Sequence, residues 1–336
     1  SSELTQDLPD SASPDNLLHW YYQMALTRVV DNKAVKLQRT GKMGTYPSTQ
    51  GQEAIGVATG IAMKKEDVYC PYYRESGALL QRGVSIEEIL SIWGGDERGN
   101  DFKVPREDFT TSVPIATQCL HAAGIAFALK HRNQKRVAVT SIGEGGTSKG
   151  DFYEAMNLAG AWNLPVVFVV NNNQWAISVP RSIQTGAKTV AQKAIAAGIP
   201  SIQVDGNDII AVYEAISGCI ERARNGSGPS LIEAVTYRLC DHTTADDATR
   251  YQPSEEVKAA WKKEPIARLA YYLEAQGLWS KEKESEMQSK IATEVDKAVQ
   301  AYLNKPKDKP QAMFDHLYAE LPETYLDQYD DVGGKA

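Results

Sequence analysis

Two short polar segments carry the residue types that could do chemistry in this chain. The segment GEGG occupies residues 143–146, and the segment NNN occupies residues 171–173. Glycines directly after a strand let backbone N–H groups approach a phosphate closely. Carboxylate and amide oxygens are hard ligands that suit Mg²⁺ or Ca²⁺. Taken singly, each segment could be an ordinary turn, but together they predict a site for a diphosphate and a divalent cation.

The stretches before these two segments predict neighbouring strands of a parallel sheet. Residues 136–142 and 165–170 are short, apolar, β-branched runs, and helical patterns at 116–130 and 151–163 alternate with them. Such alternation is typical of an α/β fold whose parallel sheet is flanked by helices on both faces. Ligands of these sheets bind at the carboxyl ends of the strands. The fold class therefore places both polar segments at one edge of the sheet.

The remaining patterns predict helical extensions at both ends of the α/β core. We expect an extended or disordered tail over residues 1–16, because this segment is polar and acidic. The α/β domain with its helical C-terminal part would span residues 17–304. A Lys/Pro linker and a terminal helix would fill residues 305–336.

Composition excludes several classes of function. The formal net charge is −7 without a compact basic run, so we expect neither nucleic acid nor a membrane as partner. The apolar runs are too short to cross a bilayer, and the N-terminus lacks a signal-peptide pattern. We expect a cytoplasmic protein or, alternatively, a mitochondrial matrix protein after processing.

The four cysteines are Cys70, Cys119, Cys219 and Cys240. No two of them form a CxxC pair, which favours buried thiols over disulfides or a zinc site.

Other phosphate-binding motifs fail at the first polar segment. A dinucleotide-binding fingerprint needs glycine three places after Gly145, where Ser148 stands. A P-loop needs lysine directly after Gly150, where Asp151 stands. These mismatches argue against a nicotinamide-dependent dehydrogenase and against an NTPase.

The segment at residues 143–178 resembles the thiamine-diphosphate motif of the 2-oxo-acid dehydrogenase alpha subunits. That motif is GDG followed about 26 residues later by NN, and here 26 residues separate Gly145 from Asn172. The resemblance extends from roughly Leu17 to Leu326. Glu144 stands where the family usually has Asp, as it does in branched-chain members, and the extra methylene alters the reach of this ligand.

The resemblance implies a set of cofactor-binding residues. Glu144, Asn173 and the backbone carbonyl of Trp175 would coordinate Mg²⁺. Other positions that match the family's thiamine diphosphate site are Tyr73, Arg74, Val113, Ile115, Gly143, Gly145, Gly146, Asn171 and His242. In branched-chain relatives, the equivalents of four residues of the segment 112–118 hold K⁺, namely Ser112, Pro114, Thr117 and Gln118.

A polar segment at residues 238–247 adds the candidate catalytic residues. A lone histidine is often structural, but the resemblance implies that His242 stabilises the reaction intermediate or positions a lipoyl group, and that Arg238 orders the loop. Asp151 and Glu154 share one face of a predicted helix. They form either an acidic first turn that the helix dipole stabilises or, as the resemblance implies, part of a proton tunnel between two active sites.

The resemblance also implies the reaction and the partners. It implies thiamine-diphosphate-dependent oxidative decarboxylation of a 2-oxo acid, with acyl transfer to a lipoyl-bearing acyltransferase. A beta subunit in an alpha2beta2 heterotetramer would supply a glutamate to the pyrimidine ring of the cofactor, so the alpha chain alone should be inactive. The segments at 147–162 and 190–206 favour pyruvate, whereas Glu144 and the short HTTADD spacing favour branched-chain substrates such as 2-oxoisovalerate. The alternative from another class of function is a binding subunit without catalytic activity.

Overall fold

Five parallel strands form the centre of the computed structural model, which describes residues 8–315 and 317–333. In spatial order the strands are β1 (Val68–Cys70), β2 (Ala138–Gly143), β3 (Val166–Asn172), β7 (Ser230–Val235) and β6 (Ser201–Asp205). Strands β2 and β3 are direct neighbours, and Gly143 stands opposite Asn171 at their carboxyl ends. The predicted parallel sheet is confirmed, as is the prediction that the two polar segments follow adjacent strands.

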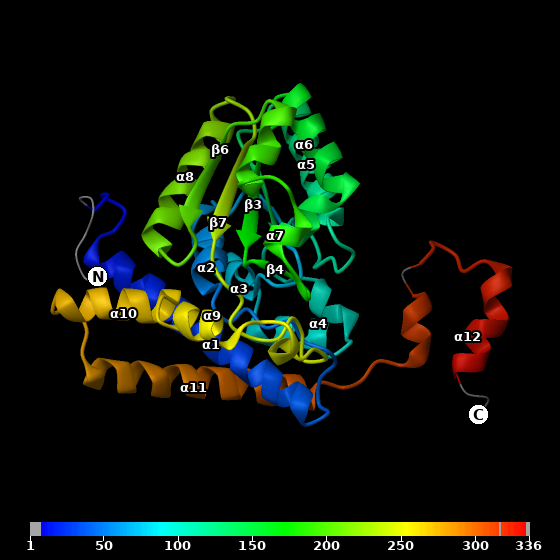
Figure 1. Ribbon diagram of the computed structural model, residues 1–336. Helices are drawn as coiled ribbons and strands as arrows, with labels where there is room; N and C mark the ends of the chain where they lie inside the picture. Colours follow the sequence, from blue (N-terminus) through cyan, green and yellow to red (C-terminus); the bar gives the residue numbers. More distant parts are fainter. Residues whose placement is uncertain (1–7, 316, 334–336) are drawn as a thin grey trace.

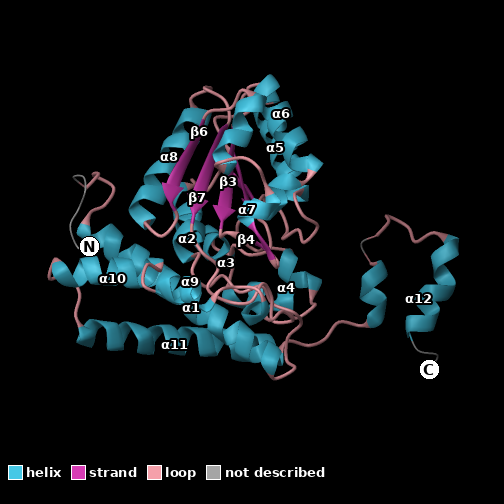
Figure 2. Ribbon diagram, viewed as in Figure 1, coloured by secondary structure: helices cyan, strands magenta, loops and turns pink. Residues whose placement is uncertain are grey.

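Helices cover both faces of this sheet, as the fold class predicted (Figures 1 and 2). Side chains alternate along a strand, so Val139 and Val167 enter one apolar core while Ala138 and Phe168 enter the other. The first core lies under α2 (Glu53–Ala62) and α8 (Ile209–Arg224). The second lies under α5 (Thr117–His131), α6 (Gly150–Ala161) and the 3₁₀ helix η3 (Val190–Ala197). Two cores fix the sheet rigidly beneath its carboxyl edge.

A layer of long helices packs beneath the α2 side of the sheet (Figure 1). It consists of α1 (Pro14–Arg39), α10 (Pro265–Ala275) and α11 (Lys281–Asn304). Helix α1 begins where Ser13 accepts a hydrogen bond from the Asn16 N–H, with proline at the first helical position. The other helices are α3 (Ser76–Arg82), α4 (Ile86–Trp93), α7 (Arg181–Gln184), α9 (Ser254–Trp261) and α12 (Leu326–Gly333). Beyond Asn304 the chain leaves the body and ends in α12 (Figure 1).

Some elements differ from the sequence-based expectation. Strand β1 and helix α3 were not predicted, and both are short enough to lack a clear periodicity. The sequence pattern of residues 187–197 predicts a helix. This segment instead contains the 3₁₀ helix η3, which begins at Val190 after a capping box between Thr189 and Gln192. The tail predicted at 1–16 lies partly outside the described residues, and α1 already begins at Pro14. The division into a tail, a domain and a terminal segment stays a prediction.

Two predictions drawn from composition can be compared with the described part of the chain. All four cysteines are free and buried or half-buried, as predicted. Among residues 8–315 and 317–333, no helix combines the length and the apolar character that crossing a membrane requires.

Candidate active site

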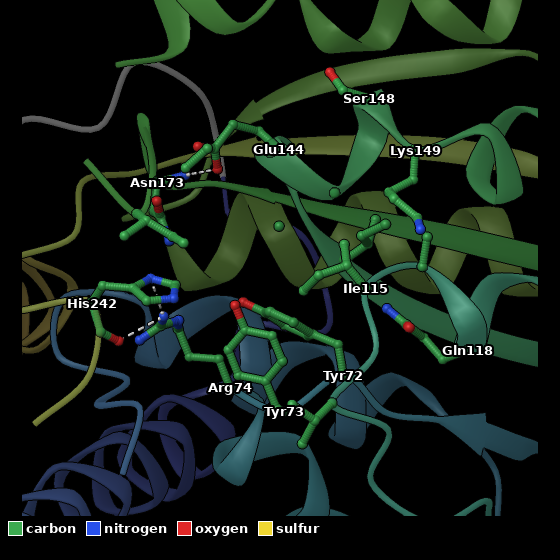
Figure 3. Close-up of a pocket in the computed structure, with 18 of the residues that line it drawn as sticks. Tyr72, Tyr73, Arg74, Ile115, Gln118, Glu144, Ser148, Lys149, Asn173 and His242 are labelled. Carbon is green, nitrogen blue, oxygen red and sulfur yellow. Dashed lines mark hydrogen bonds between the residues drawn. The ribbon is translucent and has the colours of Figure 1, made fainter. Parts of the chain in front are cut away.

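A cavity of about 420 Å³ opens at the carboxyl edge of the sheet, where β2 and β3 end. Figure 3 shows Glu144 and Asn173 on one side of it and Tyr73 and Arg74 on the other, with His242 close to Arg74. Most of the residues predicted to bind the cofactor line this cavity. They are Tyr73, Arg74, Val113, Ile115, Gly143, Glu144, Gly145, Gly146, Asn173, Trp175 and His242.

Glu144 is a buried acid with one oxygen left free. It begins the 3₁₀ turn η2 (Glu144–Ser148) directly after β2, and only 1% of its surface is exposed. One carboxylate oxygen, Oε2, accepts a hydrogen bond from the Asn173 N–H at 3.2 Å, while Oε1 has no partner. Burial raises the pKa of Glu144 to about 7. A carboxylate that is buried with one oxygen unpartnered needs a proton or a cation to compensate its negative charge.

The glycines that follow Glu144 allow a close approach of the backbone. A Cβ atom on Gly145 would lie 2.5 Å from the Cβ of Ala176, and one on Gly146 would lie 2.7 Å from Cγ1 of Ile142. Any side chain here would therefore displace the packing around the turn. The side chain of Gln184, on α7, donates from Nε2 to the Gly145 carbonyl at 3.2 Å. The turn thus lines the cavity with two residues that have no side chain, and Gln184 holds one of its carbonyl groups.

Asn173 and Trp175 supply further oxygens next to Glu144. The Oδ1 atom of Asn173 accepts from the Trp175 N–H at 3.2 Å, and Nδ2 donates to Oε1 of Gln52 at 2.8 Å. The Trp175 carbonyl accepts a long hydrogen bond of 3.4 Å from Nη1 of Arg238. Within the described residues no group of three or more His, Cys, Asp or Glu side chains could hold a metal. The oxygens next to Glu144 are uncharged, and a carboxylate combined with amide and carbonyl oxygens is a donor set that suits Mg²⁺.

Arg74 and His242 form a pair on the opposite side of the cavity. Arg74 is 3% exposed, and its Nη2 donates to both Nδ1 (3.1 Å) and the carbonyl oxygen (2.9 Å) of His242. Because a guanidinium can only donate, Nδ1 must accept, which places the imidazole proton on Nε2. Burial and the charges of Arg74 and Arg238 lower the pKa of His242 to about 3. His242 is therefore a neutral hydrogen-bond donor at neutral pH.

The loop that carries His242 is ordered by Arg238. This residue is fully buried, and its guanidinium donates to the carbonyl of Cys240 at 3.0 Å and to the hydroxyl of Tyr251 at 2.5 Å. Asp246 accepts from the same tyrosine hydroxyl and from the His242 N–H. Arg238 does not line the cavity, so this geometry supports the predicted ordering role rather than direct contact with a ligand.

One side of the cavity is apolar and open to solvent. Val113 and Ile115, 58% and 42% exposed, project from the segment before α5.

Backbone conformations that non-glycine residues rarely adopt cluster around the cavity: φ is +70° at Ala116, +72° at Gln174 and +56° at Ile177. Such strained positions are concentrated at functional sites. Ile177 lies between β4 (Trp175–Ala176) and β5 (Val179–Pro180), a small hairpin that sequence reasoning missed.

Besides Arg238, other predicted residues also do not line the cavity. Asn171 is buried, and its Nδ2 donates to Oε1 of Glu75 at 3.2 Å, so its predicted diphosphate contact receives no support from this geometry. Asp151 and Glu154 lie on α6, half-buried and exposed respectively, which in the single chain is the arrangement of an acidic helix start. Their predicted place in a tunnel involves a second subunit and stays a prediction.

Some residues around the cavity could not be predicted from the sequence. Ser148 and Lys149 line the cavity beside η2, and Gln52 and Gln184 hold Asn173 and the glycine turn from elsewhere in the chain. Glutamine gives no local signal for such a role. Only the contact across 121 residues between Gln52 and Asn173 reveals it.

The fold and the site together define a class of protein: a parallel α/β protein with a cavity at the carboxyl ends of two adjacent strands, which is the position where ligands of such sheets bind. Comparison with known proteins is more specific. The sequence profile of the family described as "Dehydrogenase E1 component" matches residues 21–311. The chain therefore belongs to the dehydrogenase E1 component family, which confirms the resemblance found in the sequence.

Individual relatives agree with this assignment. The chain is 40% identical to the pyruvate dehydrogenase E1 component subunit alpha of Staphylococcus epidermidis, over 97% of this chain and 89% of the relative. It is equally similar, over the same shares, to the protein of the same name from Staphylococcus aureus. Membership of the family implies dependence on thiamine diphosphate and assembly with a beta subunit.

Proposed function

We propose that this chain is the alpha subunit of the decarboxylating component of a bacterial, cytoplasmic 2-oxo-acid dehydrogenase complex, with pyruvate as substrate. One observation carries the proposal: Glu144 presents an unpartnered, buried carboxylate oxygen beside Asn173 at the ends of two adjacent strands. The relatives named as pyruvate dehydrogenase subunits support the choice of substrate.

The residues of the site fit thiamine diphosphate bound through Mg²⁺. Glu144, Asn173 and the Trp175 carbonyl would hold the cation, and the orphaned oxygen of Glu144 supports this assignment. The backbone of Gly145 and Gly146 would lie along the diphosphate. When bound, the thiazolium ring of the cofactor supplies the electron sink for decarboxylation. The protein's contribution is to orient this group and to compensate the negative charges of the diphosphate.

Arg74, Tyr73 and His242 would serve the anionic end and the reacting end of the cavity. A fixed guanidinium suits phosphate oxygens. Arg74 lies at the cavity, and its two hydrogen bonds to His242 hold its guanidinium in place. His242, neutral and carrying its proton on Nε2, could donate a hydrogen bond to a substrate oxygen or to a lipoyl sulfur. The proposed contribution of Arg238 is to hold this loop in place.

The exposed apolar residues on one side of the cavity favour the proposal that a second subunit binds there. Val113 and Ile115 would bind the pyrimidine ring, and an alpha2beta2 assembly would cover them with the beta subunit. The acyl group would then pass to a lipoyl-bearing acyltransferase. A potassium site formed by residues of the segment 112–118 remains part of the proposal, and the unpartnered Oε1 of the buried Gln118 supports it.

The experiment is a reconstitution of the purified alpha and beta subunits. With thiamine diphosphate and Mg²⁺, the mixture should reduce an artificial electron acceptor when pyruvate is added, while alpha alone should not. A panel with 2-oxoisovalerate tests the second candidate, which the glutamate at position 144 favours. Preference for 2-oxoisovalerate would replace the substrate, and strong activity of alpha alone would overturn the proposed division of labour.

A further inference from the structure

One buried glutamine touches the proposed cation site from outside it. Gln52 precedes α2 as its N-cap residue and is 2% exposed. Its Oε1 accepts a hydrogen bond from Nδ2 of Asn173 at 2.8 Å, and its own Nε2 has no partner. It does not line the cavity. Within the described residues, the one hydrogen bond of its side chain is therefore with a residue that we expect to bind the cation.

That contact decides which end of the Asn173 amide faces the cation. An amide side chain can present either its oxygen or its NH₂ group, and only the oxygen binds a metal. The Trp175 N–H holds Oδ1 of Asn173 at 3.2 Å, and Gln52 Oε1 accepts from the NH₂ group. If the amide were reversed, its oxygen would face the oxygen of Gln52 and its NH₂ group would face the Trp175 N–H. Both hydrogen bonds would then be lost.

The backbone around Gln52 is held firmly enough to impose this orientation. Gly51 has φ +93°, and a Cβ there would lie 2.7 Å from both the Tyr237 carbonyl oxygen and Cγ of Leu239. The Gly51 carbonyl accepts from the hydroxyl of Thr236 at 2.8 Å, just after β7. The Gln52 N–H donates to the Thr49 carbonyl at 2.9 Å. The turn before α2 is thus fixed to the end of a strand next to β3.

We propose that Gln52 is a positioning residue of the cation site: by accepting from the NH₂ group of Asn173, it keeps the Asn173 oxygen directed at the metal. This inference rests on the proposed function. Residues that form hydrogen bonds with metal ligands strongly influence the affinity for the metal. Their loss typically weakens metal binding by about 10- to 100-fold. We expect a loss of this size on removing Gln52, although Gln52 does not line the cavity.

Three variants test the proposal. In Gln52→Leu the acceptor is gone, so Mn²⁺ affinity should fall about 10- to 100-fold. In Gln52→Glu the acceptor stays, and no hydrogen bond is lost because the Nε2 that it replaces has no partner. The added negative charge also attracts a nearby cation, so this variant should bind Mn²⁺ no more weakly than the wild type. Gln50→Leu is the matched control, since the Gln50 side chain makes no hydrogen bond within the described part of the chain.

The measured quantity is the affinity of the alpha–beta assembly for Mn²⁺ with thiamine diphosphate present. Electron paramagnetic resonance measures it. Loss in Gln52→Leu, with retention in Gln52→Glu and Gln50→Leu, supports the inference. Wild-type-like affinity in Gln52→Leu overturns it while leaving the proposed function intact. Absence of Mn²⁺ binding in the wild type overturns both. If Gln52→Leu does not fold, Gln52→Asn withdraws the acceptor by one methylene and should show the same loss.

Discussion

Replacing Glu144 by glutamine should stabilise the metal-free chain while removing its cation site. Burial raises the pKa of Glu144 from 4.5 to about 7 in the folded chain. An acid whose folded pKa is raised favours folding when protonated, and this stability is lost as the pH rises through the folded pKa. At about 1.36 kcal/mol per pH unit, ionised Glu144 costs about 3 kcal/mol of the free energy of unfolding at pH 8.

Glutamine resembles the protonated acid and cannot ionise. Glu144→Gln should therefore raise the free energy of unfolding by about 3 kcal/mol at pH 8 and by less than about 1 kcal/mol at pH 5. Cation-dependent binding of thiamine diphosphate to the alpha–beta assembly should fall by about 100-fold or more, because one charged partner of a buried ionic contact is lost.

Two assays measure these opposite effects. Urea unfolding of the metal-free alpha chain at pH 8 and pH 5 gives the free energies, and calorimetry of thiamine diphosphate with Mg²⁺ gives the affinity. Glu97→Gln, which removes an exposed carboxylate from the surface helix η1 (Glu97–Asn100), is the control and should change neither quantity. A Glu144→Gln chain that is less stable than the wild type at pH 8 would refute the reasoning, because Glu144 would then be a structural residue.

Further predictions concern the rest of the site. Trp175→Phe should leave Mn²⁺ affinity within about threefold in paramagnetic resonance titrations, because only the backbone carbonyl would bind the cation; a large loss would implicate the indole. Gly145→Ala should abolish cofactor binding in calorimetry, since its Cβ would lie 2.5 Å from that of Ala176; unchanged binding would show that the turn adapts. Burial and the charges of Arg74 and Arg238 lower the pKa of His242 from 6.5 to about 3, so the free energy of unfolding should fall as the pH drops below 6.5. His242→Gln should remove up to about 1.4 kcal/mol of the loss between pH 7.5 and 5.5 in urea unfolding, and an unchanged pH dependence would contradict the buried neutral imidazole.

The sequence predicts those parts of the fold that have long, regular patterns. The runs before Glu144 and Asn171 are apolar and β-branched, so their pairing in a parallel sheet could be inferred before the structure. Strand β1 has only three residues and no flanking motif, which leaves nothing for a pattern to detect. The 3₁₀ helix η3 is rich in alanine, and its composition alone does not distinguish it from an α-helix.

The same contrast holds within the site. The positions of Glu144 and of the segment 171–173 at one edge of the sheet could be predicted because each follows a predicted strand. Within that segment, the family resemblance distinguishes Asn173 from Asn171. Gln52 could not be predicted, because its role depends on a contact between segments 121 residues apart. The pairing of Arg74 with His242 joins residues 168 apart, and the identity of the two residues does not reveal that the guanidinium would set the tautomer of the imidazole.

The central claim is that two adjacent strand ends hold one cation through Glu144 and Asn173. Anomalous diffraction from crystals of the alpha–beta assembly, grown with Mn²⁺ and thiamine diphosphate, tests it most directly. We predict a single manganese peak bound to Oε1 of Glu144, Oδ1 of Asn173 and the Trp175 carbonyl, with the diphosphate completing its ligands. A manganese peak elsewhere, or a diphosphate held without any cation between it and Glu144, would contradict the account.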